Sequence, residues 1–288
     1  MAGESASPHR EPREHPNWRE ILRDLDVHPS RALGQNFLHD QKIVERIVRV
    51  ARLSSADDVL EVGPGLGILT SELTAHAGSV TAVELDARLA RRLRDSFGER
   101  ARIVEGDILE LDLDQVIPAS DYVVVANLPY SIATAVIQRF LEHHQPPKRL
   151  VLMVQREVAE RMTARPPEMS ILAVAVQFYA HAKVEFRIGS GAFIPPPRVE
   201  SAVVRLETRE APLLPINDHQ AFFRLVRAGF SQRRKRLDNA IAASLDIQKR
   251  SAAAALSESG IEPSRRAETL DVPEWVSAYE GFRELLND

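Results

Sequence analysis

The stretch Val59-Leu60-Glu61-Val62-Gly63-Pro64-Gly65-Leu66-Gly67 reads as a buried strand that turns through three glycines into a helix. Glycine allows such a turn to tighten and lets a ligand approach the backbone closely. The helix behind the turn, expected from Leu66 to Ala77, presents unpaired backbone N–H groups at its start. A strand, a glycine turn and a helix in this order predict the first half of a βαβ unit.

The same alternation of short apolar runs and helical patterns continues along the chain. The further segments that read as strands are Val80–Glu84, Arg102–Glu105, Tyr122–Ala126 and Leu150–Val154, and those that read as helices are Asp40–Arg52, Ala87–Phe97, Ser131–Leu141 and Ser170–Ala180. Val184–Ile188 and Ser201–Leu206 are strands close enough in sequence to form an antiparallel edge. The pattern predicts an α/β fold with a Rossmann-like, largely parallel sheet.

Composition divides the 288-residue chain into three parts. Residues 1–20 combine scattered prolines with charged and polar side chains, so we expect a disordered N-terminal arm. The α/β domain is expected over residues 21–210. Pro212 and Pro215 then interrupt a linker, after which the pattern is entirely helical. We therefore expect a small all-helical domain over residues 211–288.

Polar side chains follow successive strands of the expected sheet. Gly63 and Gly65 form the first turn, and Glu84 ends the next strand about twenty positions later, where a carboxylate can accept hydrogen bonds from both ribose hydroxyls. Asp107 follows the third strand and can accept a hydrogen bond from an adenine amine. Ile68 stands where a dinucleotide-binding fingerprint expects its third glycine, which favours S-adenosylmethionine, a cofactor without a pyrophosphate. Ligands of such sheets bind at the carboxyl ends of the strands.

The tetrapeptide Asn127-Leu128-Pro129-Tyr130 follows the buried run Tyr122–Ala126. Adenine N6 is a poor nucleophile because its lone pair is delocalised into the ring, and acceptors aimed at its two N–H bonds favour the tetrahedral form that attacks a methyl group. The Asn127 side-chain oxygen and the Leu128 carbonyl are candidate acceptors. Pro129 stiffens the loop, and Tyr130 offers a face on which a base can stack. The motif predicts methyl transfer to adenine N6 without a strong general base.

The chain contains no cysteine, which excludes disulfides, thiolate metal sites, radical S-adenosylmethionine chemistry and methylation of pyrimidine C5 through a cysteine nucleophile. Its nine histidines suggest no metal set, since His143 and His144 are adjacent and adjacent residues do not face one way on a helix. No apolar run is long enough for a membrane span, and the N-terminus lacks the apolar core of a signal peptide. We therefore expect no membrane association and a cytoplasmic location.

Beyond single motifs, the chain carries five landmarks: Leu33–Leu38, Val62–Gly67, Asn127–Tyr130, Phe193–Val203 and Phe230–Lys235. In combination these segments resemble the ribosomal RNA adenine N6,N6-dimethyltransferase family, specifically its small-subunit enzymes, over about Ser30 to Leu270. The resemblance implies an S-adenosylmethionine-dependent methyltransferase. One departure lies at residues 164–169, where the Tyr-Gly pair usual in similar proteins is missing. It bears on the geometry of a loop beside the site rather than on the chemistry.

The resemblance also implies roles for particular residues. The residues implied to contact the cofactor are Asn36, Leu38, Gly63, Glu84, Asp107 and Asn127. Phe193 is implied to enclose the target base opposite Tyr130. The implied substrate is a pair of adjacent adenosines in a hairpin near the 3′ end of small-subunit (16S) ribosomal RNA, within a partly assembled 30S particle. The product would be N6,N6-dimethyladenosine, with a role in small-subunit biogenesis.

Basic residues gather late in the chain although the formal net charge is −4. No acidic residue occurs from Ala221 to Leu237, an interval that contains Arg224, Arg227, Arg233, Arg234, Lys235 and Arg236. Phosphate contacts dominate nucleic-acid affinity, so this basic patch predicts an RNA-binding surface, with a solvated helix face as the alternative. Phe222, Phe223 and Phe230 lie at helical spacing and are expected in the core. The target adenine must leave any base stack, which favours a loop or single strand.

Three other functions compete with this hypothesis. An enzyme of the same chemistry could act on large-subunit RNA and confer macrolide resistance, but the full Phe193–Ser201 segment and Leu128 favour the small-subunit type. A non-catalytic ribosome assembly factor or transcription factor could use this scaffold, although retention of the catalytic and cofactor residues argues against it. A small-molecule N-methyltransferase would not need the basic helical domain. Nothing in the sequence indicates oligomerisation, and we expect a monomer.

Overall fold

The structure, a computed structural model, describes residues 36–117, 121–232 and 234–287 of the chain. The predicted N-terminal arm over residues 1–20 lies outside the described residues, and so do Arg233 and the first part of the landmark at Leu33–Leu38. Among the residues that are described, no helix is long and apolar enough to cross a membrane.

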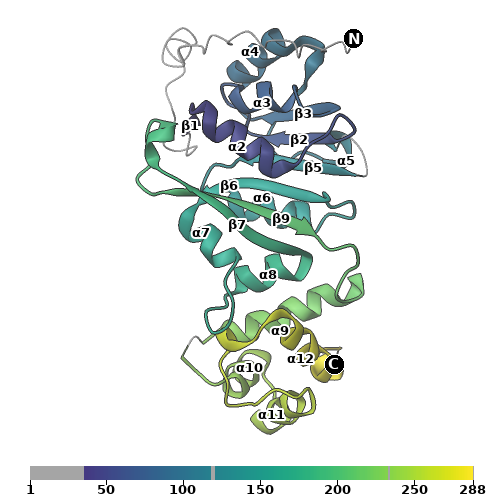
Figure 1. Ribbon diagram of the computed structural model, residues 1–288. Coiled ribbons are helices and arrows are strands. Elements are labelled where there is room, and N and C mark those ends of the chain that lie inside the picture. Colours follow the sequence, from purple (N-terminus) through teal and green to yellow (C-terminus); the bar gives the residue numbers. More distant parts are fainter. Residues whose placement is uncertain (1–35, 118–120, 233, 288) are drawn as a thin grey trace, which may run out of the picture.

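A seven-stranded sheet forms the larger part of the molecule (Figure 1). Its strands, in spatial order, are β4 (Arg102–Glu105), β3 (Ser79–Glu84), β2 (Asp58–Val62), β5 (Tyr122–Asn127), β6 (Arg149–Gln155), β9 (Ser201–Thr208) and β7 (Ala180–Ile188). The five strands from β4 to β6 are parallel, and β9 is antiparallel to both of its neighbours. The parallel sheet with an antiparallel edge that the sequence predicted is therefore confirmed.

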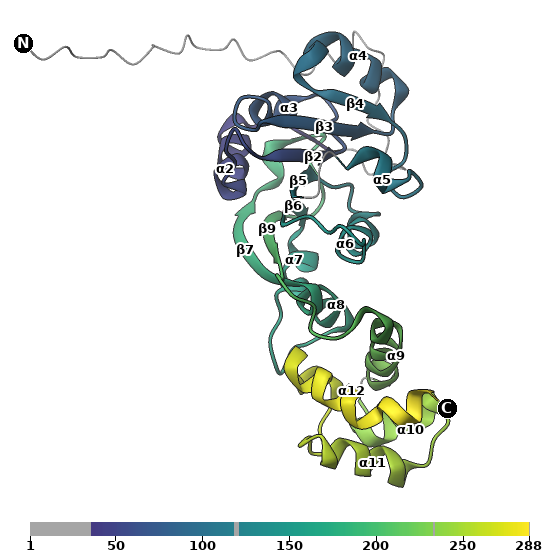
Figure 2. The same cartoon turned by 90° about the vertical axis from the view of Figure 1, so that its right-hand side faces the viewer.

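Helices cover both faces of the sheet, as Figure 2 shows. One face packs against α2 (Gln41–Ala51), α3 (Ile68–Leu73) and α4 (Ala87–Phe97), and the other against α5 (Leu113–Val116), α6 (Ala133–Leu141), α7 (Arg156–Met162) and α8 (Ile171–Tyr179). Side chains of β5 alternate between the two faces: Val123 and Val125 join the first core, while Tyr122, Val124 and Ala126 join the second. A strand buried on both faces needs a continuous apolar run, which explains the composition of this segment.

The helix after the glycine turn is shorter than the sequence predicted. It spans Ile68–Leu73 rather than Leu66 to Ala77. Gly67 has φ +85°, a left-handed conformation that cannot lie inside a right-handed helix, so α3 begins only after it. At the other end, the N–H groups of Ala75 and His76 bond to carbonyls three residues back, and the α-helical pattern stops there.

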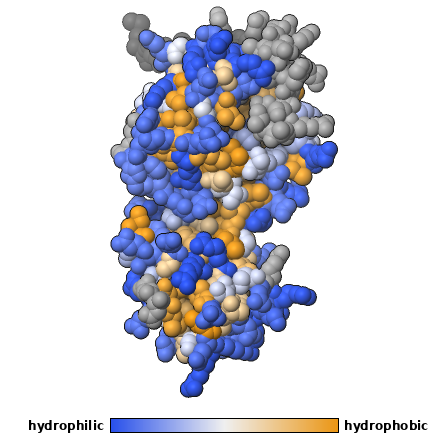
Figure 3. Space-filling model, turned by 180° about the vertical axis from the view of Figure 1, so that it is seen from behind, coloured by the Kyte–Doolittle hydropathy of each residue, from blue (hydrophilic) through white to orange (hydrophobic). Residues whose placement is uncertain are grey.

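The C-terminal part of the chain is helical, as predicted. It consists of α9 (His219–Phe230), α10 (Leu237–Leu245), α11 (Lys249–Glu258) and α12 (Val272–Asn287). Its core is shared with the sheet domain, because Met169, Val174 and Phe178 belong to the same buried cluster. The rings of Phe178 and Phe222 stack with their centroids 4.6 Å apart. The space-filling view accordingly shows apolar residues continuing through the narrow middle of the molecule (Figure 3).

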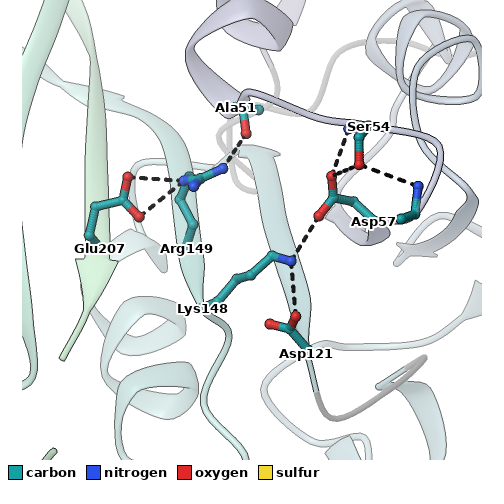
Figure 4. A network of polar contacts seen from close by, with 8 residues as sticks. Ala51, Ser54, Asp57, Asp121, Lys148, Arg149 and Glu207 are labelled. Atoms are coloured by element: carbon teal, nitrogen blue, oxygen red, sulfur yellow. Dashed lines mark hydrogen bonds and ion pairs between the residues drawn. The ribbon is translucent and has the colours of Figure 1, made fainter. Parts of the chain in front are cut away.

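A polar network ties strand starts together at the edge where the parallel strands begin (Figure 4). The Lys148 ammonium lies 2.8 Å from Asp57 and 3.2 Å from Asp121, and Asp57 also accepts hydrogen bonds from Ser54. The hydrogen bond from Lys148 lowers the pKa of Asp57 to about 2. These ionic contacts join the starts of β2, β5 and β6.

Candidate active site

A cavity opens at the carboxyl ends of the parallel strands beside β2, where the order of strands reverses: β3 and β4 lie on one side of β2, and β5 and β6 lie on the other. This is the topological switch point at which open α/β sheets bind ligands. Of the predicted site residues, those lining the cavity are Asn36, Gly63, Gly65, Glu84, Asp107, Asn127, Leu128, Pro129 and Tyr130. The structure thus brings together side chains that are dispersed over almost a hundred positions of sequence.

The glycine turn is close-packed at Gly65 and Gly67. Gly65 has φ +56°, and a Cβ built on it would lie 3.0 Å from the Phe37 ring. A Cβ on Gly67 would lie 2.8 Å from Leu93 and 2.9 Å from Phe97, both on α4. Only glycine combines this backbone conformation with such close neighbours. The turn therefore presents bare backbone to the cavity.

Glu84 is buried at the cavity wall, with 5% of its surface exposed. Its two oxygens accept hydrogen bonds from backbone N–H groups, one from Gly65 and one from Asp86, each at 2.9 Å. Burial raises the pKa of Glu84, and these backbone donors oppose the rise. Each carboxylate oxygen can accept more than one hydrogen bond, so Glu84 is held in a fixed position with acceptor capacity remaining for a ligand.

Asp107 lies one strand further along the same edge. Its Oδ1 accepts a hydrogen bond from the Leu109 N–H at 2.8 Å, which makes Asp107 a turn residue as well as a cavity residue. Arg139 of α6 stabilises this turn, because its guanidinium donates hydrogen bonds to the carbonyls of Leu109 and Leu111. The Asp107 carboxylate is therefore oriented by the fold before any ligand arrives.

Asn127 ends β5 at the centre of the cavity edge. Its Nδ2 donates a hydrogen bond to the Asn36 carbonyl at 3.1 Å. Because an amide has one donor end and one acceptor end, this bond assigns the orientation of the side chain and turns Oδ1 away from Asn36. The next residue is fixed as well, since the Leu128 N–H donates to the Met153 carbonyl at 3.2 Å. The two predicted acceptors therefore stand on anchored backbone.

Tyr130 lines the cavity, whereas Phe193 does not. The Tyr130 hydroxyl lies 2.6 Å from Ser201 Oγ, and burial raises the pKa of the phenol. Phe193 is only 2% exposed and belongs to β8 (Phe193–Ile194), which pairs with β1 (Phe37–Leu38). The ring lies in the core beneath these strands. The implied pairing of Phe193 with Tyr130 around a base stays a prediction.

Leu38 lies beside the glycine turn rather than in the main cavity. It is 3% exposed, pairs with Phe193, and lines a smaller adjoining cavity together with Pro64 and Leu69. The N–H of the following His39 donates to the Ala192 carbonyl at 3.0 Å. The landmarks at 33–38 and 193–203 are thus two sides of one contact.

Sequence reasoning missed several residues of the site. Leu85 and Ile108 form apolar walls of the main cavity, and Leu85 is 51% exposed. Glu61 lines the smaller cavity, is 1% exposed, and has one oxygen without a hydrogen-bond partner among the described residues. Desolvation raises the pKa of Glu61 to about 8. An acid within the apolar strand Val59-Leu60-Glu61-Val62 was the signal that could have found it.

The basic patch is only partly as predicted. Arg224, Arg227, Arg234, Lys235 and Arg236 are all exposed, at or just beyond α9. Arg236, however, forms an ion pair with the buried Asp238 at 2.9 Å, which occupies part of its charge. Arg224 donates to the Leu286 carbonyl at the end of α12. The interleaved phenylalanines belong to the helical core, as the sequence indicated.

The adjacent histidines come together after all, because they lie in a turn after α6 rather than on a helix. His143 Nε2 and His144 Nε2 lie 3.4 and 3.3 Å from Asp114 Oδ1. His143 Nδ1 lies 3.2 Å from the backbone nitrogen and 3.3 Å from the carbonyl oxygen of Gln145.

The loop at 164–169, where the sequence departs from similar proteins, joins α7 to α8. The Ala164 carbonyl accepts a hydrogen bond from Gln177 Nε2 at 2.8 Å, and the Met169 N–H donates to the Glu268 carbonyl at 3.0 Å. None of its residues lines the main cavity. Through the hydrogen bond from Met169 to Glu268, the loop contacts the helical region.

Comparison with known proteins places this geometry in context. The family model for ribosomal RNA adenine dimethylase matches residues 28–283. Ribosomal RNA small subunit methyltransferase A of Dehalococcoides mccartyi is 43% identical over 263 residues, covering 89% of each chain. The protein of the same name from Bacillus licheniformis is 38% identical over 280 residues, covering 93% of this chain and 96% of its own.

Solved structures show the same likeness. The crystal structure of a dimethyladenosine transferase from Plasmodium falciparum has a TM-score of 0.76 at 26% identity and covers 86% of this chain and 98% of its own. That of the 23S rRNA methyltransferase ErmE has a TM-score of 0.70 at 28% identity and covers 86% and 100%.

Proposed function

The chain belongs to the ribosomal RNA adenine dimethylase family, and from this premise we propose that it transfers methyl groups from S-adenosylmethionine to N6 of two adjacent adenosines in a hairpin near the 3′ end of small-subunit (16S) ribosomal RNA. The product is N6,N6-dimethyladenosine. The observation that carries the proposal is the meeting of Asn127 with Glu84 and Asp107 at one cavity at the switch point of the sheet.

The residues around the cavity fit S-adenosylmethionine. Glu84 and Asp107 offer oriented carboxylates for a ribose and an adenine amine, and Leu85 and Ile108 supply apolar walls for a flat ring. Gly63 and Gly65, with Asn36 and Leu38 beside them, leave backbone exposed next to the site. When bound, this cofactor supplies an electrophilic methyl group on a sulfonium, which is a good leaving group.

The tetrapeptide then acts on the adenine. Asn127 Oδ1 and the Leu128 carbonyl accept hydrogen bonds from the two N–H groups of N6, which shifts its lone pair out of the ring and toward the methyl group. Asn127 meets this need because its Nδ2 is already engaged by Asn36. The Tyr130 ring supports the base by stacking. The proton leaves N6 after transfer, and neutral acceptors permit a second round on the same nitrogen.

RNA is held by the basic patch on the helical domain, while the target base leaves its stack to enter the cavity. We propose further that the substrate is a partly assembled small subunit, met in the cytoplasm by a monomer. The names of the relatives, small-subunit methyltransferases that match over most of their length, support the small-subunit part of this proposal. The large-subunit alternative has weaker support, since ErmE is 28% identical to this chain, whereas the two small-subunit methyltransferases are 43% and 38% identical to it.

The substrate can be tested directly. Labelled S-adenosylmethionine is supplied with undermethylated small subunits and, in parallel, with large-subunit RNA, and the nucleosides are identified after digestion. N6,N6-dimethyladenosine in the small subunit alone is expected. Label only in the large subunit would transfer the function to the resistance-type reaction, and RNA binding without any label would leave a non-catalytic assembly factor.

A further inference from the structure

Tyr130 is tied to a strand far from it in sequence. Its hydroxyl and Ser201 Oγ are 2.6 Å apart, a normal length for a hydrogen bond between two hydroxyls. The strand β6 lies between β5, which leads into Tyr130, and β9, which Ser201 opens. Neighbouring strands are about 4.8 Å apart, so the tyrosine reaches over the carboxyl end of a whole strand. The Tyr130 ring therefore lies along one side of the cavity opening.

Ser201 is a rigid anchor. Its side chain is fully buried, and its backbone pairs with Gln155 of β6 and Ile188 of β7. The preceding Glu200 accepts the Arg156 backbone N–H at 2.9 Å, and its carboxylate lies 2.6 Å from Arg156 Nη1. The hydroxyl is therefore fixed by two strands and by the start of α7, whereas Tyr130 stands on a loop.

The Tyr130 hydroxyl depends on this anchor. Within the described part of the chain, Ser201 is its hydrogen-bond partner. A half-buried phenol without a partner would lose a hydrogen bond, and its ring would be free to rotate about two side-chain bonds. A base that stacks on a rotating ring would place its N6 correctly for methyl transfer less often. Small misplacements of reacting groups slow a reaction strongly.

We propose that Ser201 is a positioning residue for methyl transfer, whose hydroxyl holds the Tyr130 ring in the orientation that presents the target adenine to Asn127. The inference rests on the proposed function of the cavity. It gives the buried serine of the Phe193–Val203 landmark a role beyond packing, although Ser201 does not line the main cavity.

The first test examines the hydrogen bond between Tyr130 and Ser201 without measuring methyl transfer. The chain has four tyrosines, so 13C-labelled tyrosine gives few NMR signals, and Tyr130→Phe identifies the one from Tyr130. Ser201→Ala is expected to shift that signal and to leave the other three in place. As a matched control, Thr208→Val removes a hydroxyl from the far end of the same strand, where it bonds to Pro147, and should leave Tyr130 unchanged. An unmoved Tyr130 signal in Ser201→Ala would overturn the proposal.

The second test is a double-mutant cycle on single-turnover methylation of small subunits. Ser201→Ala and Tyr130→Phe should each lower the rate about tenfold, with the affinity for S-adenosylmethionine changed less than about twofold. The double variant should also be about tenfold slower, because both changes remove the same bond. Unchanged rates, or losses that multiply to about a hundredfold, would show that Ser201 does not act through Tyr130. A wild-type protein that makes no dimethyladenosine would refute the proposed function, while the NMR result would still decide whether the anchor exists.

Discussion

At the scale of single residues, Glu61 is an acid that the proposed chemistry does not use. It lies in β2, between the glycine turn and the core, and desolvation raises its pKa to about 8 from an ordinary value of 4.5. A carboxyl with a raised pKa binds its proton more tightly in the folded state than in the unfolded state. Its contribution to the free energy of unfolding is therefore favourable at low pH and is lost as the pH rises from about 4.5 to about 8.

Replacement of Glu61 by Gln removes this titration. Without cofactor, wild-type protein should lose more stability between pH 5 and pH 8 than Glu61→Gln, because the variant has no carboxyl to deprotonate. Urea denaturation of both proteins at the two pH values measures the difference. Parallel pH dependences would mean that Glu61 is already ionised in the folded protein.

At the scale of elements, the packing between the glycine turn and α4 makes a sharp prediction. Gly67→Ala should destabilise the protein by about 1–3 kcal/mol, since its Cβ meets Leu93 and Phe97 and its φ is +85°. It should also weaken cofactor binding, because Gly63 and Gly65 of the same turn line the cavity. Gly260→Ala is the matched control, with φ +75° and open space around its Cβ. Equal losses of stability in the two variants would show that backbone conformation alone, rather than packing, sets the cost.

Much of the arrangement of elements could be predicted because each strand carried its own signal. The run Tyr122–Ala126 has to be buried on both faces, and the polar residue after each parallel strand necessarily reaches one edge. The predicted helix start at Leu66 was wrong. A sequence pattern does not distinguish a glycine in the left-handed conformation from a glycine inside a helix. The histidine turn was misjudged for a related reason, since helical geometry was assumed where the chain had left the helix.

Long-range polar contacts could not be predicted. The bonds from Asn127 to Asn36 and from Tyr130 to Ser201 join positions 91 and 71 residues apart. No local pattern encodes such a pairing, because it depends on how the loops cross the end of the sheet. The ion pair of Arg236 with Asp238 shows the same limit at short range: the sequence identified the charges of the patch but did not show which of them has a partner.

At the scale of the whole molecule, the shared core predicts that the sheet and the helical region unfold as one cooperative unit. Trp275 is fully buried in the helical core, and the other of the two tryptophans, Trp18, lies outside the described residues. In a Trp18→Phe background, the fluorescence of Trp275 should follow the same denaturation curve as far-UV circular dichroism. Two separate transitions would show that the helical region unfolds independently.

The position of the basic patch relative to the cavity predicts its effect on RNA binding. Arg234→Ala with Lys235→Ala should weaken binding and lower the slope of log affinity against log salt by about 1 for each phosphate that the protein no longer neutralises. Arg91→Ala with Arg94→Ala removes the same charge from α4, at the opposite end of the molecule (Figure 1). If both pairs change the slope equally, net charge rather than this patch governs binding.

The most direct test of the central claim is the dimethyladenosine yield of Asn127→Ala on undermethylated small subunits, measured beside RNA affinity. Turnover should be abolished and affinity for the RNA largely unchanged, because the proposed mechanism assigns Asn127 to N6 in the cavity and RNA binding to the basic patch. Dimethyladenosine formed at the wild-type rate would contradict the mechanism.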